Sequence, residues 1–210
     1  MSAIALFSIV SMNSAVAQKG FSLSVKASPQ FNWMNNTNDK PTSIYDRRST
    51  FGASFGVGGQ YNFTDHMGVG LDVLYSLQGQ KYHLDGEKYH QKNDYVKVPL
   101  LFAFTAGPVD KVAFYGKVGP QLSFLTNSKL DGDLKRVETR DRFRNVTLGG
   151  AAAAGVQFAL AKNISLNTGL RVDHDFTNVE NNNNPVYNSG TAVSHNSTLG
   201  LEVGLNFKFK

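Results

Sequence analysis

The sequence predicts an all-β protein, an eight-stranded antiparallel up-and-down transmembrane β-barrel. Three observations predict this fold class. Apolar and polar residues alternate with a period of two along eight segments, short turns alternate with long polar connections between them, and no stretch approaches the run of about 20 apolar residues that a membrane-spanning helix needs. In such a barrel one face of each strand meets lipid, and the other face lines the interior.

The composition suits one such domain. The chain has 210 residues, of which 20 are Gly, 15 are Phe and 8 are Tyr, as expected for curved antiparallel strands with interfacial aromatic residues. It contains no cysteine, which excludes disulfides and cysteine metal sites. The formal net charge of +5 is spread over loops and alternating positions, so nucleic acid is not an expected partner.

The first 17 residues have the features of a secretory signal peptide. Residues 3–10 form a short apolar core, and Ala15, Val16 and Ala17 form a small-residue cleavage site. No Lys or Arg precedes the core, and the alternative interpretation is a disordered apolar tail. We expect cleavage after Ala17, residues 18–210 as the barrel domain, and a location in the outer membrane of a Gram-negative bacterium.

The first three strands are predicted at residues 21–33, 50–63 and 67–77, because apolar or aromatic side chains occupy alternate positions in each. A long polar loop at residues 35–47 separates the first two strands. A short turn at residues 64–66 separates the second strand from the third. The pattern therefore starts with one long and one short connection.

The fourth and fifth strands are predicted at residues 95–106 and 112–125, with a tight turn between them. Pro99 interrupts the fourth strand, and its missing N–H predicts a bulge or a local gap in the ladder. Long polar loops are predicted on either side of this hairpin, at residues 80–93 and 126–142.

The sixth strand, predicted at residues 145–160, contains the run Gly-Gly-Ala-Ala-Ala-Ala-Gly. Four alanines in a row would also propagate a helix, but the flanking glycines and the alternating apolar residues around the run favour a strand. The seventh strand, at residues 164–175, follows a short turn. An asparagine-rich loop at residues 177–191 leads to the last strand.

The last strand, predicted at residues 198–209, has the most regular alternation in the chain. Six apolar residues share one face, and the series ends in two phenylalanines. This ending resembles the carboxy-terminal signal by which outer-membrane barrels are recognised for assembly. The resemblance implies the barrel assembly machinery as a partner during biogenesis, beside outer-membrane lipids, and an assembly signal formed by Leu205, Phe207 and Phe209.

Four positive and four negative side chains fall on the predicted inner face. The interior of an eight-stranded barrel is only just wide enough for side chains to fill it, so charges there must be paired or hydrated. We expect a plugged, salt-bridged interior, and the alternative is a polar pore for small solutes. The eight residues are Lys26, Asp72, Lys97, Lys117, Arg171, Asp173, Asp175 and Glu202.

Two segments resemble a known family. Residues 95–101 read Tyr-Val-Lys-Val-Pro-Leu-Leu, and residues 114–122 read Phe-Tyr-Gly-Lys-Val-Gly-Pro-Gln-Leu. They are similar to two consecutive strands of the PorT-like small outer-membrane barrel proteins, and the likeness extends loosely over residues 20–210. The resemblance implies an eight-stranded outer-membrane barrel in a family whose best-known member is needed for type IX protein secretion. These motifs are structural and imply no active site.

The strongest enzymatic pattern is His195-Asn196-Ser197, which resembles the His-x-Ser of outer-membrane lipid A deacylases. A strand would place His195 and Ser197 on its lipid face near the outer rim. An activating histidine needs a carboxylate to orient it, and the candidates in the sequence are Glu180 and Asp175. A rim histidine and serine that meet water or lipid headgroups are the simpler interpretation.

Metal-binding patterns in the predicted loops are weak. His83 and His90 flank Asp85 and Glu87, but a solvated flexible loop is the favoured interpretation of these residues. The segment Asp131-Gly132-Asp133 resembles a fragment of a calcium loop and lacks the downstream glutamate. We therefore expect no catalytic, cofactor-binding or metal site.

The sequence as a whole favours a non-enzymatic outer-membrane barrel that is a structural or accessory component of the envelope. It would act through its outer loops or through other envelope or secretion proteins. Three alternatives stay open: a small-solute porin, a lipid A deacylase-like enzyme, and a soluble barrel that carries a ligand. The last would require apolar side chains inside the barrel.

Overall fold

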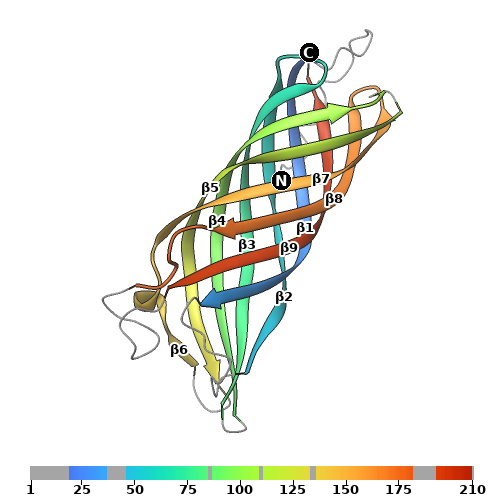
Figure 1. The fold of residues 1–210 in the computed structure, drawn as a ribbon. Helices are drawn as coiled ribbons and strands as arrows, with labels where there is room; N and C mark the ends of the chain where they lie inside the picture. Colours follow the sequence, from blue (N-terminus) through green and yellow to red (C-terminus); the bar gives the residue numbers. More distant parts are fainter. Residues whose placement is uncertain are drawn as a thin grey trace, which may run out of the picture.

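The computed structural model describes residues 19–36, 46–84, 87–108, 111–132, 136–181 and 193–209. The predicted signal peptide lies outside these residues. Within them, the chain folds into one closed, elongated barrel (Figure 1). No helix of the described residues has the length and apolar character needed to cross a membrane.

Eight long antiparallel strands form the wall of the barrel. β1 pairs with both β2 and β9, and the pairing of β4 with β5 continues the circuit through β7 and β8 back to β9. The predicted eight-stranded antiparallel barrel is therefore confirmed. The strands are β1 Gly20–Asn36, β2 Asp46–Asn62, β3 Met67–Leu84, β4 Glu87–Ala106, β5 Val112–Gly132, β7 Val146–Ala161, β8 Ile164–Asp175 and β9 Ser194–Lys208.

Apolar side chains cover the outside of the barrel, and polar side chains fill the inside. Along β9, Leu199, Leu201, Val203 and Leu205 are between 39% and 50% exposed, whereas Glu202 is 2% exposed. The same alternation runs along the other long strands. Because a soluble carrier needs the opposite arrangement, this distribution overturns that alternative and suits a lipid environment.

Two predicted loops are wrong in their extent. β3 and β4 continue through most of residues 80–93 as a hairpin, and β5 runs on to Gly132. Figure 1 shows these strands reaching toward its lower end. Polar residues were expected to end the strands, but Gln80, Gln91 and Asn93 are buried inside the barrel, where amides satisfy one another. Polarity alone therefore does not mark the end of a barrel strand.

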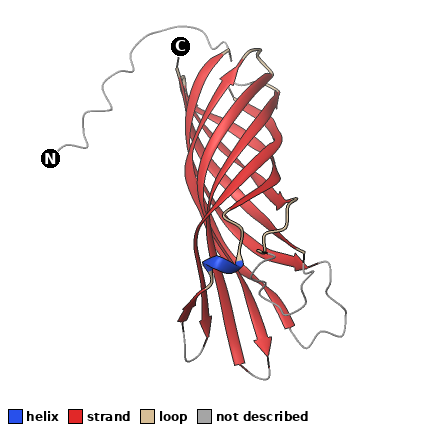
Figure 2. Ribbon diagram, turned by 90° about the vertical axis from the view of Figure 1, so that its left-hand side faces the viewer, coloured by secondary structure: helices blue, strands red, loops and turns tan. Residues whose placement is uncertain are grey.

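The remaining parts of the predicted third long loop also carry structure. β6, Arg136–Glu138, pairs with the end of β5, and the 3₁₀ turn η1, Arg140–Arg142, follows it (Figure 2). The short turns lie at the opposite end of the barrel. Outer-membrane barrels keep short turns on the periplasmic side, so the end that carries β6 and η1 is the outer end.

Pro99 coincides with a gap in the β3–β4 ladder. The two strands pair at Leu71↔Leu100 and next at Leu74↔Lys97, with the same register on both sides. The bulge on this strand lies elsewhere, between Asp94 and Tyr95 in the pairing with β5. The local gap predicted from the missing N–H is thus present.

A small apolar cluster lies inside the outer end. It contains Tyr95, Leu125, Phe143 and Val179, and Met34 packs against it. Phe143 precedes β7, and Val179 belongs to the segment after β8, where the backbone bridges Phe143 to Glu180. The cluster therefore lies on the outer side of the middle of the barrel.

Candidate functional site: the charged interior and the outer rim

Six charged side chains meet near the middle of the barrel and form one continuous network. Arg171 of β8 is its centre: its Nη1 lies 3.1 Å from Glu202 and 3.6 Å from Asp72, and its Nε lies 3.0 Å from Asp173. Lys26 Nζ donates to Asp72 at 2.6 Å, and Lys97 Nζ donates to Asp173 at 2.9 Å. All six side chains are nearly inaccessible to solvent.

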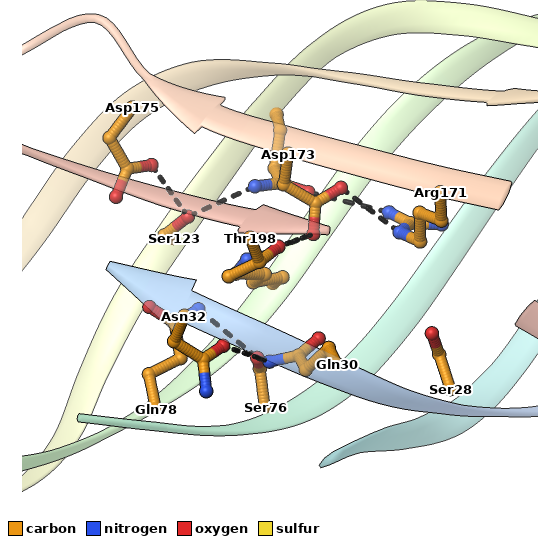
Figure 3. A network of polar contacts seen from close by, with 12 residues as sticks. Ser28, Gln30, Asn32, Ser76, Gln78, Ser123, Arg171, Asp173, Asp175 and Thr198 are labelled. Atoms are coloured by element: carbon orange, nitrogen blue, oxygen red, sulfur yellow. Dashed lines mark hydrogen bonds and ion pairs between the residues drawn. The ribbon is translucent and has the colours of Figure 1, made fainter. Parts of the chain in front are cut away.

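The network combines three positive and three negative groups, so it is neutral. Its members come from β1, β3, β4, β8 and β9, on different sides of the barrel. Charges removed from water are tolerated only when they are paired and hydrogen bonded. Thr198 also donates to Asp173, as Figure 3 shows beside Arg171. The arrangement joins opposite walls of the barrel.

The other two predicted interior residues do not join the network. Asp175 lies nearer the outer end and accepts a hydrogen bond from Ser123 at 3.3 Å (Figure 3). Lys117 lies toward the short-turn end, and its Nζ is 5.8 Å from the centre of the Tyr115 ring. Sequence alternation could assign the inward face of these residues but not their partners.

Further polar clusters fill the rest of the outer half of the barrel interior. Their residues were not among the predicted site residues. Gln30 donates to Asn32 at 2.8 Å and to Ser76 at 3.0 Å (Figure 3). Further out, the Gln91 amide donates to Ser128 and Thr139. The signal that could have found them is the run of amide and hydroxyl residues at inward positions.

Cavities that border the polar lumen among the described residues are small. One of about 20 Å³ lies near Lys117, and one of about 10 Å³ lies near Asn93. A single water needs roughly 10–15 Å³. Each cavity therefore has room for one or a few waters, and neither provides a passage for a solute.

The structure does not pair His195 with Ser197, as the deacylase alternative would require. Ser197 Oγ lies 2.8 Å from Nδ1 of His174 on the neighbouring strand, whereas Nδ1 of His195 donates to the Asp175 carbonyl oxygen at 3.0 Å. His195 and Ser197 lie on the same face of β9, but His174 lies directly opposite Ser197 on the neighbouring strand and is its closer partner. The two imidazole rings stand 5.8 Å apart.

The candidate carboxylates do not orient either histidine. Asp175 accepts from Ser123, and Glu180 accepts from Ser194. Among the described residues, none of the carboxylates hydrogen bonds to His174. The outer rim thus has a serine–histidine contact without the third group that a catalytic triad requires.

Each predicted metal pattern has one potential metal-binding side chain among the described residues. These are His90 in the first pattern and Asp131 in the second. The side chains of His83, Asp85 and Glu87 and the whole of Asp133 lie outside the described residues. Burial lowers the pKa of His90, and nearby Lys92 and Lys81 lower it further. A hydrogen bond from Lys92 lowers the pKa of Asp131, which also pairs with Arg136. The described part of the chain contains no cluster of three metal-binding side chains.

The predicted assembly signal lies at the short-turn end of the barrel. Leu205 and Phe209 are exposed on its outer face, and Phe207 is half-buried. The N–H of Phe209 donates to the carbonyl of Phe21 at 2.8 Å, which extends the pairing of β9 with β1. Recognition of these residues by the assembly machinery stays a prediction.

An apolar outer surface, a closed circuit of antiparallel strands and a polar interior define an outer-membrane β-barrel protein. The family model of the outer membrane protein beta-barrel domain matches residues 16–181. The chain belongs to this family, which places it in the outer membrane of Gram-negative bacteria. A search of curated proteins gives no match.

Solved structures share the fold at low sequence identity. Neisserial surface protein A is 16% identical, with a TM-score of 0.51. The alignment covers 91% of this chain and 98% of the neisserial protein. OprG of Pseudomonas aeruginosa is 13% identical with a TM-score of 0.51, with coverages of 91% and 97%. AlkL, determined in DMPC lipid bilayers, is also 13% identical with a TM-score of 0.51, with coverages of 96% and 95%.

Proposed function

We propose that this protein is a non-enzymatic outer-membrane barrel that acts through its outer end as a structural or accessory component of an envelope or secretion complex. The observation that carries the proposal is the filled interior. A neutral ion network occupies the middle of the lumen, and the cluster of Phe143, Val179, Tyr95 and Leu125 lies on its outer side. A barrel without a passage has its outer strands, its loops and its lipid face available for function.

The resemblance to PorT-like proteins supports the accessory role. Its first motif begins at Tyr95, which is 1% exposed and accepts a hydrogen bond from Asn196 across the barrel. Pro99, in the same motif, is buried at the ladder gap. Both residues have structural roles, which fits a family defined by its barrel. Secretion proteins in the same membrane are the proposed partners.

The outer end offers a surface suited to proteins. The strands β4 and β5 continue well beyond the apolar band, and β6 and η1 add a further layer with exposed Arg136 and Arg140. Phe124 is the last exposed large apolar residue on β5, and Gly132 lies eight residues further, about 26 Å along a strand. The strands therefore reach past the membrane, where soluble or membrane-bound partners are accessible.

Site-specific photo-crosslinking in living cells tests this role. A photoreactive residue replaces Arg140 at the outer end, and the matched control carries it at Lys162 in the short turn at the other end. We expect a discrete protein adduct from position 140 that position 162 does not give. Protein adducts from neither position, in cells that contain the folded barrel, would contradict the proposal.

A lipid-ester hydrolase is the second candidate, because Ser197 contacts His174 at 2.8 Å near the outer rim. Three points favour the non-enzymatic proposal. Ser197 is only 6% exposed, the histidine comes from a different strand than the motif implied, and the described residues supply no carboxylate to orient it. A serine hydroxyl is a weak nucleophile without that support.

A further inference from the structure

The interior contains one small cavity whose chemistry is unlike that of the ion network. It has a volume of about 20 Å³, lies near the short-turn end of the barrel and is lined by eleven residues. Two of these residues are lysines, Lys117 and Lys208, and none of the described residues that line it is acidic. The cavity is therefore a positively charged, polar recess on the periplasmic side.

Three buried polar atoms at this cavity have no hydrogen-bond partner among the residues that the structure describes. They are Tyr115 Oη, Ser165 Oγ and Asn167 Oδ1, and their residues are between 2% and 5% exposed. Buried polar groups are almost always satisfied, so an unpartnered set that lines one recess indicates a bound species. Two of the three are hydroxyl groups that can donate a hydrogen bond.

The charge of Lys117 is also unbalanced within the interior. Asp72 and Glu202, which act on it electrostatically, already pair with Lys26 and Arg171. Asp175 accepts a hydrogen bond from Ser123. Ser123 lies six residues from Lys117 along β5, a distance of about 20 Å on an extended strand. No carboxylate of the network is therefore left to neutralise this ammonium group.

We propose that the recess binds a small monovalent anion of about the size of chloride, with Lys117 as the counter-charge and the Tyr115 and Ser165 hydroxyls as donors. The volume supports this class of ligand, because a space for one or a few waters admits a halide but not a phosphate or sulfate group. Asn167 Oδ1 is an acceptor and would bond to a water beside the ion.

Anion binding would give Lys117 a counter-charge close to its ammonium group. The ion network is neutral by itself, and a bound halide compensates Lys117 as a paired partner in a desolvated site. A ligand that binds only the folded state stabilises that state in proportion to the logarithm of its concentration. The folded barrel should therefore become more stable as halide replaces a bulky anion.

The experiment uses the full purified barrel, folded in detergent, with bromide as the probe. Unfolding temperature is followed by gel mobility of unboiled samples while sodium bromide replaces sodium gluconate at constant ionic strength. We expect an unfolding temperature that rises with the logarithm of the bromide concentration once this exceeds the dissociation constant. Lys117→Met should weaken bromide binding by roughly tenfold or more, because it removes a charged partner. Lys162→Met, an exposed lysine at the same end, is the matched control and should keep the rise.

Tyr115→Phe provides a second test if Lys117→Met does not fold, since it removes one hydroxyl and keeps the ring. It should also weaken the bromide effect. In bromide-soaked crystals, an anomalous peak is expected beside Lys117 and Tyr115. Equal unfolding temperatures in bromide and gluconate, or a bromide effect that both variants retain, would overturn the proposal and leave a cavity that holds water only.

Discussion

At the scale of single residues, Arg171 holds the interior together. It contacts Asp72, Asp173 and Glu202, so its removal leaves three buried carboxylates with only two lysines. Breaking a buried ion pair by removing one partner costs about 3–5 kcal/mol. We expect Arg171→Met to lower the free energy of unfolding by about that amount.

Urea titration of the folded barrel in lipid vesicles measures this change. The matched control is Leu170→Val, an adjacent lipid-facing position that is 60% exposed and should change stability by less than about 1 kcal/mol. An Arg171→Met barrel as stable as the wild type would show that the network does not stabilise the fold.

Gly58 provides the space that Asp72 occupies. A Cβ atom at this position would overlap Asp72 Oδ1 and approach Ser24 Oγ to 2.8 Å, so a side chain would displace the partner of Lys26. We expect Gly58→Ala to lower the unfolding temperature, with a cost of about 1–3 kcal/mol. Gly116→Ala is the control, because a Cβ there meets no atom within 4 Å. Equal effects of the two substitutions would contradict this role.

The sequence predicts which face of a strand a side chain occupies but not which side chain it contacts. Period-two alternation indicates which side chains face inward, as for Lys97 of β4 and Asp173 of β8. It does not indicate that these two meet, because contact across the lumen depends on the stagger of all the strands between them. Ser197 illustrates the same limit, since its partner His174 comes from the neighbouring strand.

At the scale of elements, the outer extension of β4 and β5 is held by charges in water. Lys92 donates to Asp131 at 2.6 Å, and Arg136 of β6 lies 3.2 Å from the same carboxylate. The hydrogen bond from Lys92 lowers the pKa of Asp131. A lowered pKa in the folded state stabilises the strand pairing above the usual aspartate pKa, and this contribution is lost as pH falls through the lowered value.

Carbon-detected NMR titration of the Asp131 carboxylate tests this interaction. Lys92→Met should return the pKa of Asp131 toward its usual value, whereas Lys111→Met, at the opposite end of the barrel, should leave it unchanged. If the pKa of Asp131 is the same in the Lys92→Met variant and the wild type, the hydrogen bond does not exist in solution. The backbone amides of β6 should lose protection from hydrogen exchange as the pH falls through the lowered pKa of Asp131.

The elements also show why strand ends are hard to predict. The connections at residues 80–93 and 126–142 are rich in polar and charged residues, which normally indicate loops. In this barrel the interior is polar as well, so Gln91 and Ser128 are as well placed in a strand as Val or Leu would be in a soluble sheet. The apolar band marks the membrane-spanning part of each strand and not its end.

At the scale of the whole molecule, the fold follows from the sequence with few additional facts. Eight alternating segments with three short turns define the strand count and the order, and closure of β1 on β9 follows from the need to leave no open edge in lipid. The outer cluster could not be predicted, because Phe143 and Val179 lie in segments without periodicity. Such contacts depend on the path of the chain after the strands end.

The interior of this barrel is filled and closed to solutes, and chemical labelling of single positions tests this directly. The chain has no cysteine, so single-cysteine variants report on one position each. Ser76 and Ser123 are both 0% exposed inside the barrel, and Thr64 lies exposed in a short turn. Each is replaced by cysteine and treated with a water-soluble maleimide, with folding verified by the gel mobility of unboiled samples.

A filled interior predicts that Thr64→Cys is labelled rapidly in the folded barrel, and that Ser76→Cys and Ser123→Cys react only after boiling. Rapid labelling of the two interior positions in the folded barrel would contradict a filled interior. It would show a water-filled lumen and favour a small-solute porin.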